Sequence, residues 1–135
     1  MASNPEIENT FSRFQEANKR LIEVVSSEMD QKGIRRDAVI KRFEFTYEIL
    51  WKTFKRVAQR EKIETFSPKA AIQAAFRFGL IKDERLYLDI IDARNKTTHV
   101  YSEEDVMQIY NFILKKVVDE FKQVEERLKQ YIQKI

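Results

Sequence analysis

The sequence predicts an all-helical fold, an antiparallel four-helix up-and-down bundle with one extra short helix. The chain has 135 residues, which we assign to a single domain over residues 1–135, and 43% of them are hydrophobic, enough for a core. It contains only two glycines and two prolines, too few for the frequent turns of a β-sandwich or barrel. Apolar residues instead recur at intervals of three and four, the period of an amphipathic helix.

Two long helices are predicted in the first half of the chain. The first covers residues 5 to about 30, and its apolar stripe has the polar Asn18 on the same seam. Gly33 follows near its end, where a left-handed backbone is accessible to glycine. Asp37 is the predicted N-cap of the second helix, whose stripe runs from Ile40 to Val57.

Three further helices are predicted from their start signals. Ser67-Pro68 begins a short helix that stops at Gly79, and Asp83 begins the next one. Ser102, with Asp105 three residues later, resembles a capping box for a last helix of roughly 34 residues. That helix would span about 50 Å if it were straight. Because this exceeds what so small a bundle needs, we expect a homodimer in which the first and last helices supply surface.

The composition excludes several classes of site. Cysteine is absent, which removes disulfides, thiol nucleophiles and thiolate metal sites, and His99 is the only histidine. We therefore expect no metal and no cofactor. The chain has no run of 18 apolar residues, and its first residues lack the basic-then-apolar pattern of a signal peptide. We expect a cytoplasmic protein without a membrane contact.

Positive charge is concentrated in one segment although the net charge is only +3. Residues 32–62 carry ten basic and four acidic side chains. Such a surface attracts RNA or nucleotide phosphates, and Lys52, Lys55 and Arg56 are the candidate contacts. The alternative is an ordinary solvated helix face in a lysine-rich protein.

The segment from Asp92 to Tyr101 contains the residues best suited to catalysis. Histidine moves protons readily at neutral pH, and arginine grips phosphate oxygens in a bidentate fork. On a continuous helix Arg94 and His99 lie about 140° apart, so they share a site only if the helix ends near Thr98 and the loop turns back. The alternative is structural: His99 interacts with the helix dipole, and Arg94 pairs with Asp89 or Asp92.

The same segment resembles the signature of the HEPN superfamily, Arg94-x4-His99-x-Tyr101 with Asn95 after the arginine. More closely, the chain resembles the nucleotidyltransferase substrate-binding proteins, which include the toxin halves of HEPN/MNT pairs. The likeness covers nearly the whole chain. Its other motifs are Arg42–Lys52 (RFEFTYEILWK), Ser67-Pro68, Ala75–Ile81 (AFRFGLI) and Asp89–Asp92.

The resemblance implies a helical-bundle homodimer with the motif near a cleft between subunits, and a minimal nucleotidyltransferase as partner. In toxin members the motif is a metal-independent ribonuclease site, and the partner adds AMP to the motif tyrosine. Carried over, His99 is the acid/base, Arg94 clamps the phosphate and transition state, and Asn95 orients or polarises the site. Tyr101 is the modification acceptor, and Asp92 holds the arginine in place.

Three hypotheses follow. In the first, the protein is a ribonuclease toxin of a type VII-like toxin–antitoxin pair that cuts RNA at a dimer cleft. In the second, it is a non-catalytic subunit that holds a nucleotide or other substrate for a two-component nucleotidyltransferase. In the third, it is a purely structural bundle. Cleavage of RNA that is lost on His99→Ala distinguishes the first from the second.

Overall fold

The computed structural model describes residues 4–28, 33–99 and 102–135, and every regular element within these ranges is helical. In chain order the elements are α1 (Pro5–Ser26), α2 (Ile34–Arg60), α3 (Pro68–Arg77), α4 (Glu84–Lys96), the 3₁₀ turn η1 (Thr97–His99), α5 (Glu103–Phe112), the π-helical segment η2 (Ile113–Val117) and α6 (Val118–Lys134). None of the helices in these ranges is long and apolar enough to cross a membrane.

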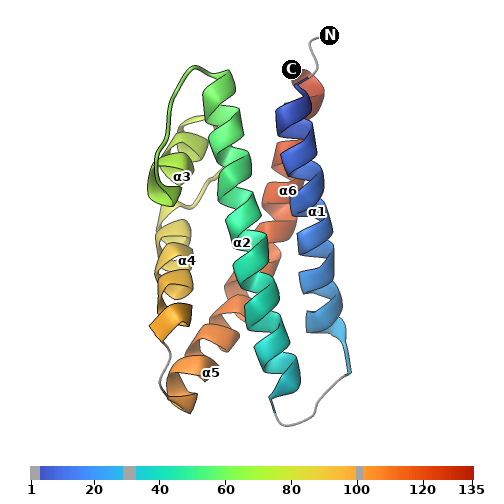
Figure 1. Cartoon of the computed structure of the whole chain (residues 1–135), viewed down its shortest axis with the longest axis vertical. Helices are drawn as coiled ribbons and strands as arrows, with labels where there is room; N and C mark the ends of the chain where they lie inside the picture. The colour runs from blue at the N-terminus through green and yellow to red at the C-terminus, as the bar shows by residue number, and fades with distance from the viewer. Residues whose placement is uncertain (1–3, 29–32, 100–101) are drawn as a thin grey trace.

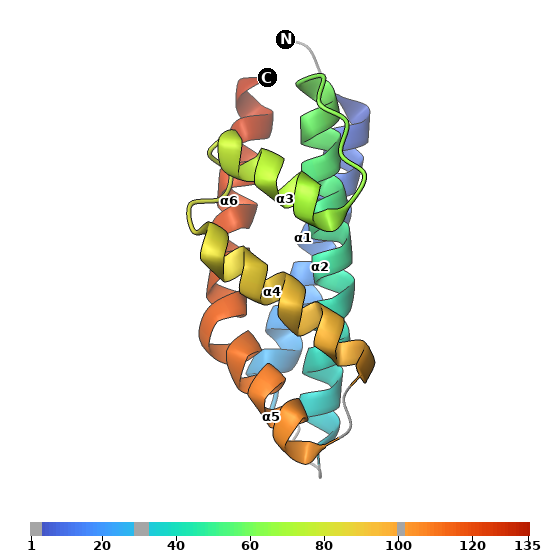
Figure 2. The ribbon, with the colours of Figure 1, turned by 90° about the vertical axis from the view of Figure 1, so that its left-hand side faces the viewer.

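Four helical rods alternate in direction along the long axis of the molecule. In Figure 1, α1 runs downward, α2 upward, α4 downward, and the rod of α5 and α6 upward, so that both chain ends lie at the top. The short α3 connects α2 to α4, and both α3 and α4 cross obliquely over one face of the bundle (Figure 2). The predicted antiparallel four-helix bundle with an extra short helix is confirmed.

Side-chain caps begin three of the helices where the sequence predicts them. Ser67 Oγ accepts from the Ala70 amide at 3.1 Å, and Asp83 Oδ1 accepts from the Leu86 amide at 3.0 Å. The hydroxyl of Ser102 accepts from Asp105 N at 3.1 Å. Each cap satisfies an amide that has no partner inside its own helix. These caps fix where α4 begins and where α5 begins after the 3₁₀ turn.

The boundary between α1 and α2 differs from the prediction. The first helix ends at Ser26, earlier than residue 30, and α2 begins at Ile34, three residues before the predicted cap. Gly33 supplies the turn with a left-handed φ of 86°. The Asp37 amide already donates to the Gly33 carbonyl at 2.9 Å. Asp37 therefore lies within the first turn of α2 and is not its N-cap.

Aromatic rings fill the core where α1, α2 and α6 meet. The ring of Phe121 lies 6.2 Å from that of Phe14, edge to face, and 6.4 Å from that of Phe43 in a stacked arrangement. Asn18 lies on the same seam as the sequence predicts, and it is fully buried. Its amide nitrogen donates to Glu125 Oε1 at 3.0 Å, so the polar group joins α1 to α6.

The predicted single last helix is interrupted. The backbone is π-helical over η2, and the rod changes direction between α5 and α6 (Figure 2). A π-helical turn accommodates an extra residue without ending the helix, which shifts the apolar face after it. Ile113 and Val117 within it are fully buried. Because of this interruption, α5 lies beside the end of α4, where the two helices line one pocket, while α6 packs along α1.

A buried polar network joins α4 to α6. The Tyr87 hydroxyl donates to Glu120 Oε2 at 2.7 Å, and Arg127 Nη1 donates to the same oxygen at 3.0 Å. Arg127 also donates to the Leu80 carbonyl at 3.1 Å, between α3 and α4. Burial, with the adjacent Glu120, raises the pKa of Tyr87 well above its ordinary value, so this phenol remains protonated and can donate. The network anchors the helix that carries the candidate site residues.

Candidate active site at the end of α4

Arg94 is held in place by the neighbouring helix α2. Its Nη1 lies 3.2 Å from Glu44 Oε2 and donates to Thr97 Oγ1 at 3.0 Å. Both side chains of the ion pair are largely buried, with exposed fractions of 27% for Arg94 and 19% for Glu44. Arg94 Nε is buried and has no hydrogen-bond partner among the described residues. The guanidinium is thus oriented by one carboxylate and retains an unused donor.

Two threonines continue the helical path beyond the end of α4. Thr97 Oγ1 donates to the Arg94 carbonyl at 2.6 Å, and Thr98 Oγ1 donates to the Asn95 carbonyl at 2.8 Å. These bonds add a second donor to carbonyls that already accept from the Thr97 amide at the helix end. The chain therefore winds on as a 3₁₀ turn through His99. Up to His99 the chain does not turn back towards Arg94, which is the condition under which the two residues would share a site within one chain.

His99 instead lines a pocket between α4 and α5. The pocket has a volume of about 370 Å³, and Arg94 is not among its lining residues. Besides His99, it is lined by Asp89, Asp92, Ala93, Lys96, Asp105, Gln108, Ile109 and Phe112. Three carboxylates face one lysine and one imidazole, so the pocket is acidic. Among the described residues no group of three or more His, Asp or Glu is arranged to hold a metal ion.

The remaining predicted site residues have different surroundings. Asp92 pairs with Lys96 at 3.2 Å, so the predicted support of Arg94 by Asp92 is supplied by Glu44 in this structure. Asn95 is exposed on the last turn of α4. Tyr101, the predicted modification acceptor, lies outside the described residues.

Sequence reasoning missed the contributions of α2 to this site. Glu44 and Tyr47 both belong to the Arg42–Lys52 motif, which was used only to identify the resemblance. Burial raises the pKa of Tyr47 to about 12, with a further upward contribution from Glu48 and a downward one from Arg94. Tyr47 therefore stays neutral beside the guanidinium. The sequence signal that could have revealed this contribution is the spacing of Glu44 and Tyr47, which lie three residues apart on one side of the predicted second helix.

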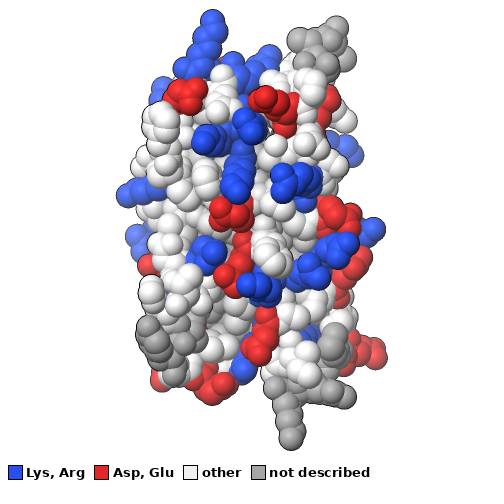
Figure 3. Space-filling model, viewed as in Figure 1, with Lys and Arg blue, Asp and Glu red and all other residues white. Residues whose placement is uncertain are grey.

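The predicted nucleic-acid contacts lie in a separate pocket between α1 and α2. Lys52, Lys55 and Arg56 line a volume of about 360 Å³ together with Thr10, Arg13, Trp51 and Gln59. Figure 3 shows Lys and Arg gathered over the upper half of this face, above the N-terminal half of α1 and the C-terminal half of α2. Three of the ten cations in residues 32–62 therefore gather here with Arg13 of α1, whereas Arg35 and Arg36, at the other end of α2, contact Tyr110 and Glu103.

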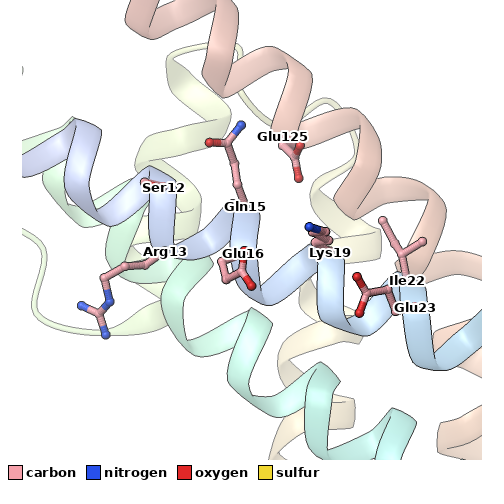
Figure 4. A pocket seen from close by; sticks show the side chains of 8 residues that line it. All are labelled: Ser12, Arg13, Gln15, Glu16, Lys19, Ile22, Glu23 and Glu125. Atoms are coloured by element: carbon pink, nitrogen blue, oxygen red, sulfur yellow. The ribbon is translucent and has the colours of Figure 1, made fainter.

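A larger hollow of the surface lies between α1 and α6. Its volume is about 910 Å³, and it is lined by Ser12, Arg13, Gln15, Glu16, Lys19, Ile22, Glu23 and Glu125. Acidic and basic groups are mixed along it, and none of the lining residues belongs to α4. Figure 4 shows that Arg13 extends away from the other lining side chains. We assign no chemistry to this groove.

Comparison with known proteins identifies the family. The family model described as "Nucleotidyltransferase substrate binding protein like" matches residues 9–130. The chain belongs to this family. The resemblance drawn from its sequence motifs is confirmed.

Individual relatives agree with the family assignment. A crystal structure from Thermus thermophilus has 35% identity and a TM-score of 0.75 over 85% of this chain and 98% of that one. A Haemophilus influenzae structure, described as revealing the fold of a substrate-binding domain of a nucleotidyltransferase, has 26% identity and a TM-score of 0.64 over 93% of this chain and 98% of that one.

A curated relative from Haemophilus influenzae carries the name "Probable ribonuclease HepT". It is 38% identical to this chain over 76 residues, which are 53% of this chain and 52% of the relative. The match thus spans about half the length of that protein.

Proposed function

We propose that this protein is the partner of a minimal nucleotidyltransferase and cleaves RNA without a metal, using Arg94 and His99 at the end of α4. The observation that carries the proposal is the presentation of these two groups at one helix end, with Arg94 oriented by Glu44 and His99 lining an open pocket. Membership of the family and the name of the curated relative support it. Action as a toxin with the nucleotidyltransferase as antitoxin is part of the same proposal.

The chemistry requires proton transfer and charge stabilisation. His99 removes the proton from a ribose 2′-hydroxyl, whose oxygen then attacks the adjacent phosphorus. The bond from phosphorus to the 5′-oxygen breaks, and that oxygen takes a proton, leaving a 2′,3′-cyclic phosphate. Arg94 binds the phosphoryl oxygens as negative charge develops on them. One histidine per site supplies one of the two proton transfers, and a water molecule supplies the proton that the leaving 5′-oxygen takes.

The second candidate is a binding subunit that holds a nucleotide or other substrate for the nucleotidyltransferase. Two observations favour it. The pocket at His99 contains three carboxylates, and the charge of Arg94 is already paired with Glu44. Both features disfavour an RNA phosphate and suit a ligand with hydrogen-bond donors or positive charge.

RNA cleavage by the purified chain separates the two candidates. We expect His99→Ala and Arg94→Ala to lower the cleavage rate by about 10²–10⁴-fold. His99→Ala removes an exposed side chain, so the free energy of unfolding should change by only about 1 kcal/mol. Arg94→Ala leaves the largely buried Glu44 without its partner and should cost more, up to about 3 kcal/mol. Lys129→Ala, an exposed residue on α6, is the matched control and should retain full activity. Full cleavage by both active-site variants, or none by the unaltered protein, contradicts the ribonuclease proposal.

Tyr101 is the proposed acceptor of AMP from the partner enzyme. Tyr101→Phe keeps the ring and removes only the hydroxyl, so it should preserve cleavage and abolish nucleotide transfer. Mass spectrometry after incubation with the nucleotidyltransferase and ATP measures this directly. A Phe variant that still gains the mass of AMP places the modified residue elsewhere.

A further inference from the structure

The pocket between α1 and α2 has the charge of an anion-binding site. Of its seven lining residues, Arg13, Lys52, Lys55 and Arg56 are cations, and none is a carboxylate. We call this set, together with Trp51, the basic pocket. Arg13 extends towards it from α1, away from the groove shared with α6 (Figure 4). Two helices therefore contribute cations to one small hollow.

These cations are only weakly neutralised by carboxylates. Lys52 Nζ lies 3.7 Å from Glu48 Oε1, and Arg56 Nη1 lies 3.5 Å from Glu6 Oε2. Both distances are long for ion pairs, and the Glu6 side chain is 72% exposed, so solvent screens the interaction. Arg13 and Lys55 have no carboxylate partner within the part of the chain that the structure describes. A phosphate entering the pocket would compete with few existing contacts.

An aromatic side chain lies among the cations. Trp51, the only tryptophan, lines the basic pocket and is half-buried. Its indole Nε1 is buried and has no acceptor among the described residues. Cations beside an aromatic side chain are the usual means of binding a single nucleic-acid strand, because its phosphates and unstacked bases are both accessible.

Part of the basic pocket lies on the same face of α2 as the contact to Arg94, whereas its Lys52 and Arg56 lie about 80° and 120° around the helix from Glu44. Trp51 and Lys55 follow Glu44 by seven and eleven residues, which at 100° per residue places all three within about 20° of one line. The axial separations are about 11 Å and 17 Å. A single RNA strand that runs along α2 from Trp51 and Lys55 therefore reaches the Glu44–Arg94 pair.

We propose that the basic pocket binds the backbone of single-stranded RNA whose reacting phosphate lies at Arg94. Arg13, Lys52, Lys55 and Arg56 bind neighbouring phosphates, and one base packs against Trp51. This inference rests on the proposed ribonuclease function, since it assigns the position of that enzyme's substrate. Glu48 competes with phosphate for Lys52, so its removal should strengthen binding.

The fluorescence of Trp51 provides a test that does not depend on activity. The probe is a short 2′-O-methyl oligouridylate, which lacks the hydroxyl that attacks in cleavage. We expect it to quench the fluorescence and the Lys52→Glu/Lys55→Glu variant to bind at least tenfold more weakly. The slope of log affinity against log salt should become shallower by about 0.7 for each cation lost. Glu48→Gln should bind severalfold more tightly, and Lys129→Glu on α6 should bind like the unaltered chain.

Each outcome identifies which proposal fails. Equal affinity and salt slope for the Lys52→Glu/Lys55→Glu variant overturn the basic pocket as an RNA site. Loss of binding to the nucleotidyltransferase in that variant, with RNA affinity unchanged, makes the surface a protein interface and overturns it too. If the probe binds as expected but neither natural RNA nor any short RNA is cut, the ribonuclease proposal fails while the pocket stands as a binding site.

Discussion

Glu44 orients the guanidinium of Arg94 from the neighbouring helix α2. Its carboxylate is the only acidic partner that Arg94 has among the described residues, at 3.2 Å. Glu44→Gln keeps the side-chain size but weakens the orientation of the guanidinium. Because small displacements of a positioning group are costly, we expect kcat for RNA cleavage to fall about tenfold or more with little change in KM. Steady-state kinetics measure this, and Glu126→Gln, exposed on α6, serves as the control. Unchanged kcat for Glu44→Gln would leave Arg94 independent of α2.

Tyr47 gives the fold a predictable response to alkaline pH. Burial raises its pKa to about 12 in the folded state, whereas an unfolded tyrosine ionises near pH 10. The stabilisation is therefore fully present below about pH 10 and is lost as the pH rises towards 12, because the unfolded chain releases the proton first. The loss approaches about 2–3 kcal/mol at pH 12. Urea unfolding at increasing pH should show a shallower decline for Tyr47→Phe, and Tyr87 and Tyr131, whose pKa values are also raised, contribute to the decline that remains. An identical decline in both proteins would contradict this assignment.

At the scale of elements, the network of Tyr87, Glu120 and Arg127 determines how firmly α4 is attached to α6. Glu120 and Arg127 are only 10% and 18% exposed, so removing one partner leaves a poorly solvated charge on the other. We expect Arg127→Met to lower the free energy of unfolding by about 3 kcal/mol, as measured by urea denaturation. Adding Glu120→Gln to that variant should recover part of the loss, because no unpaired carboxylate remains. Additive losses in the double variant would show that the two side chains act independently.

The elements divide into those that local sequence determines and those that packing determines. Ser67, Asp83 and Ser102 could be assigned as caps because a cap needs only its own side chain and an amide three residues away. The same rule failed at Asp37, because the left-handed Gly33 had already started the helix. The π-helical turns of η2 left no clear local signal, since Ile113–Val117 reads like the regular helix around it.

The candidate site follows the same division. The residue types at Arg94 and His99 and their helix-end location could be predicted from the sequence. The pairing of Arg94 with Glu44, fifty residues earlier, could not, because it depends on how α4 crosses α2. The position of His99 beside α5 could not be predicted either. It follows from the 3₁₀ turn Thr97–His99, in which the hydroxyls of Thr97 and Thr98 bond back to the last turn of α4. Nearby carboxylates on α4 were the obvious candidates for Arg94, but Asp89 and Asp92 pair with Arg85 and Lys96 instead.

At the scale of the whole molecule, one chain holds the two reactive groups apart. Arg94 is turned to α2, and His99 lines the pocket shared with α5. A second copy related by a two-fold axis could bring the arginine of one subunit to the histidine of the other. We therefore expect a homodimer, with a mass in light scattering of about twice 16.2 kDa. A monomer that cleaves RNA at full rate would contradict the shared site.

Mixed dimers test how that shared site is built. Co-expression with two different tags yields dimers in which one subunit carries Arg94→Ala and the other His99→Ala. If each site takes its arginine and histidine from different subunits, one of the two sites is intact, and about half of the activity should remain. The converse dimer pairs an unaltered subunit with one that carries both substitutions. Each of its composite sites lacks one group, so it should be inactive. If instead both groups act within one chain, the first dimer is inactive and the second keeps about half of the activity, because only the unaltered subunit then has a complete site.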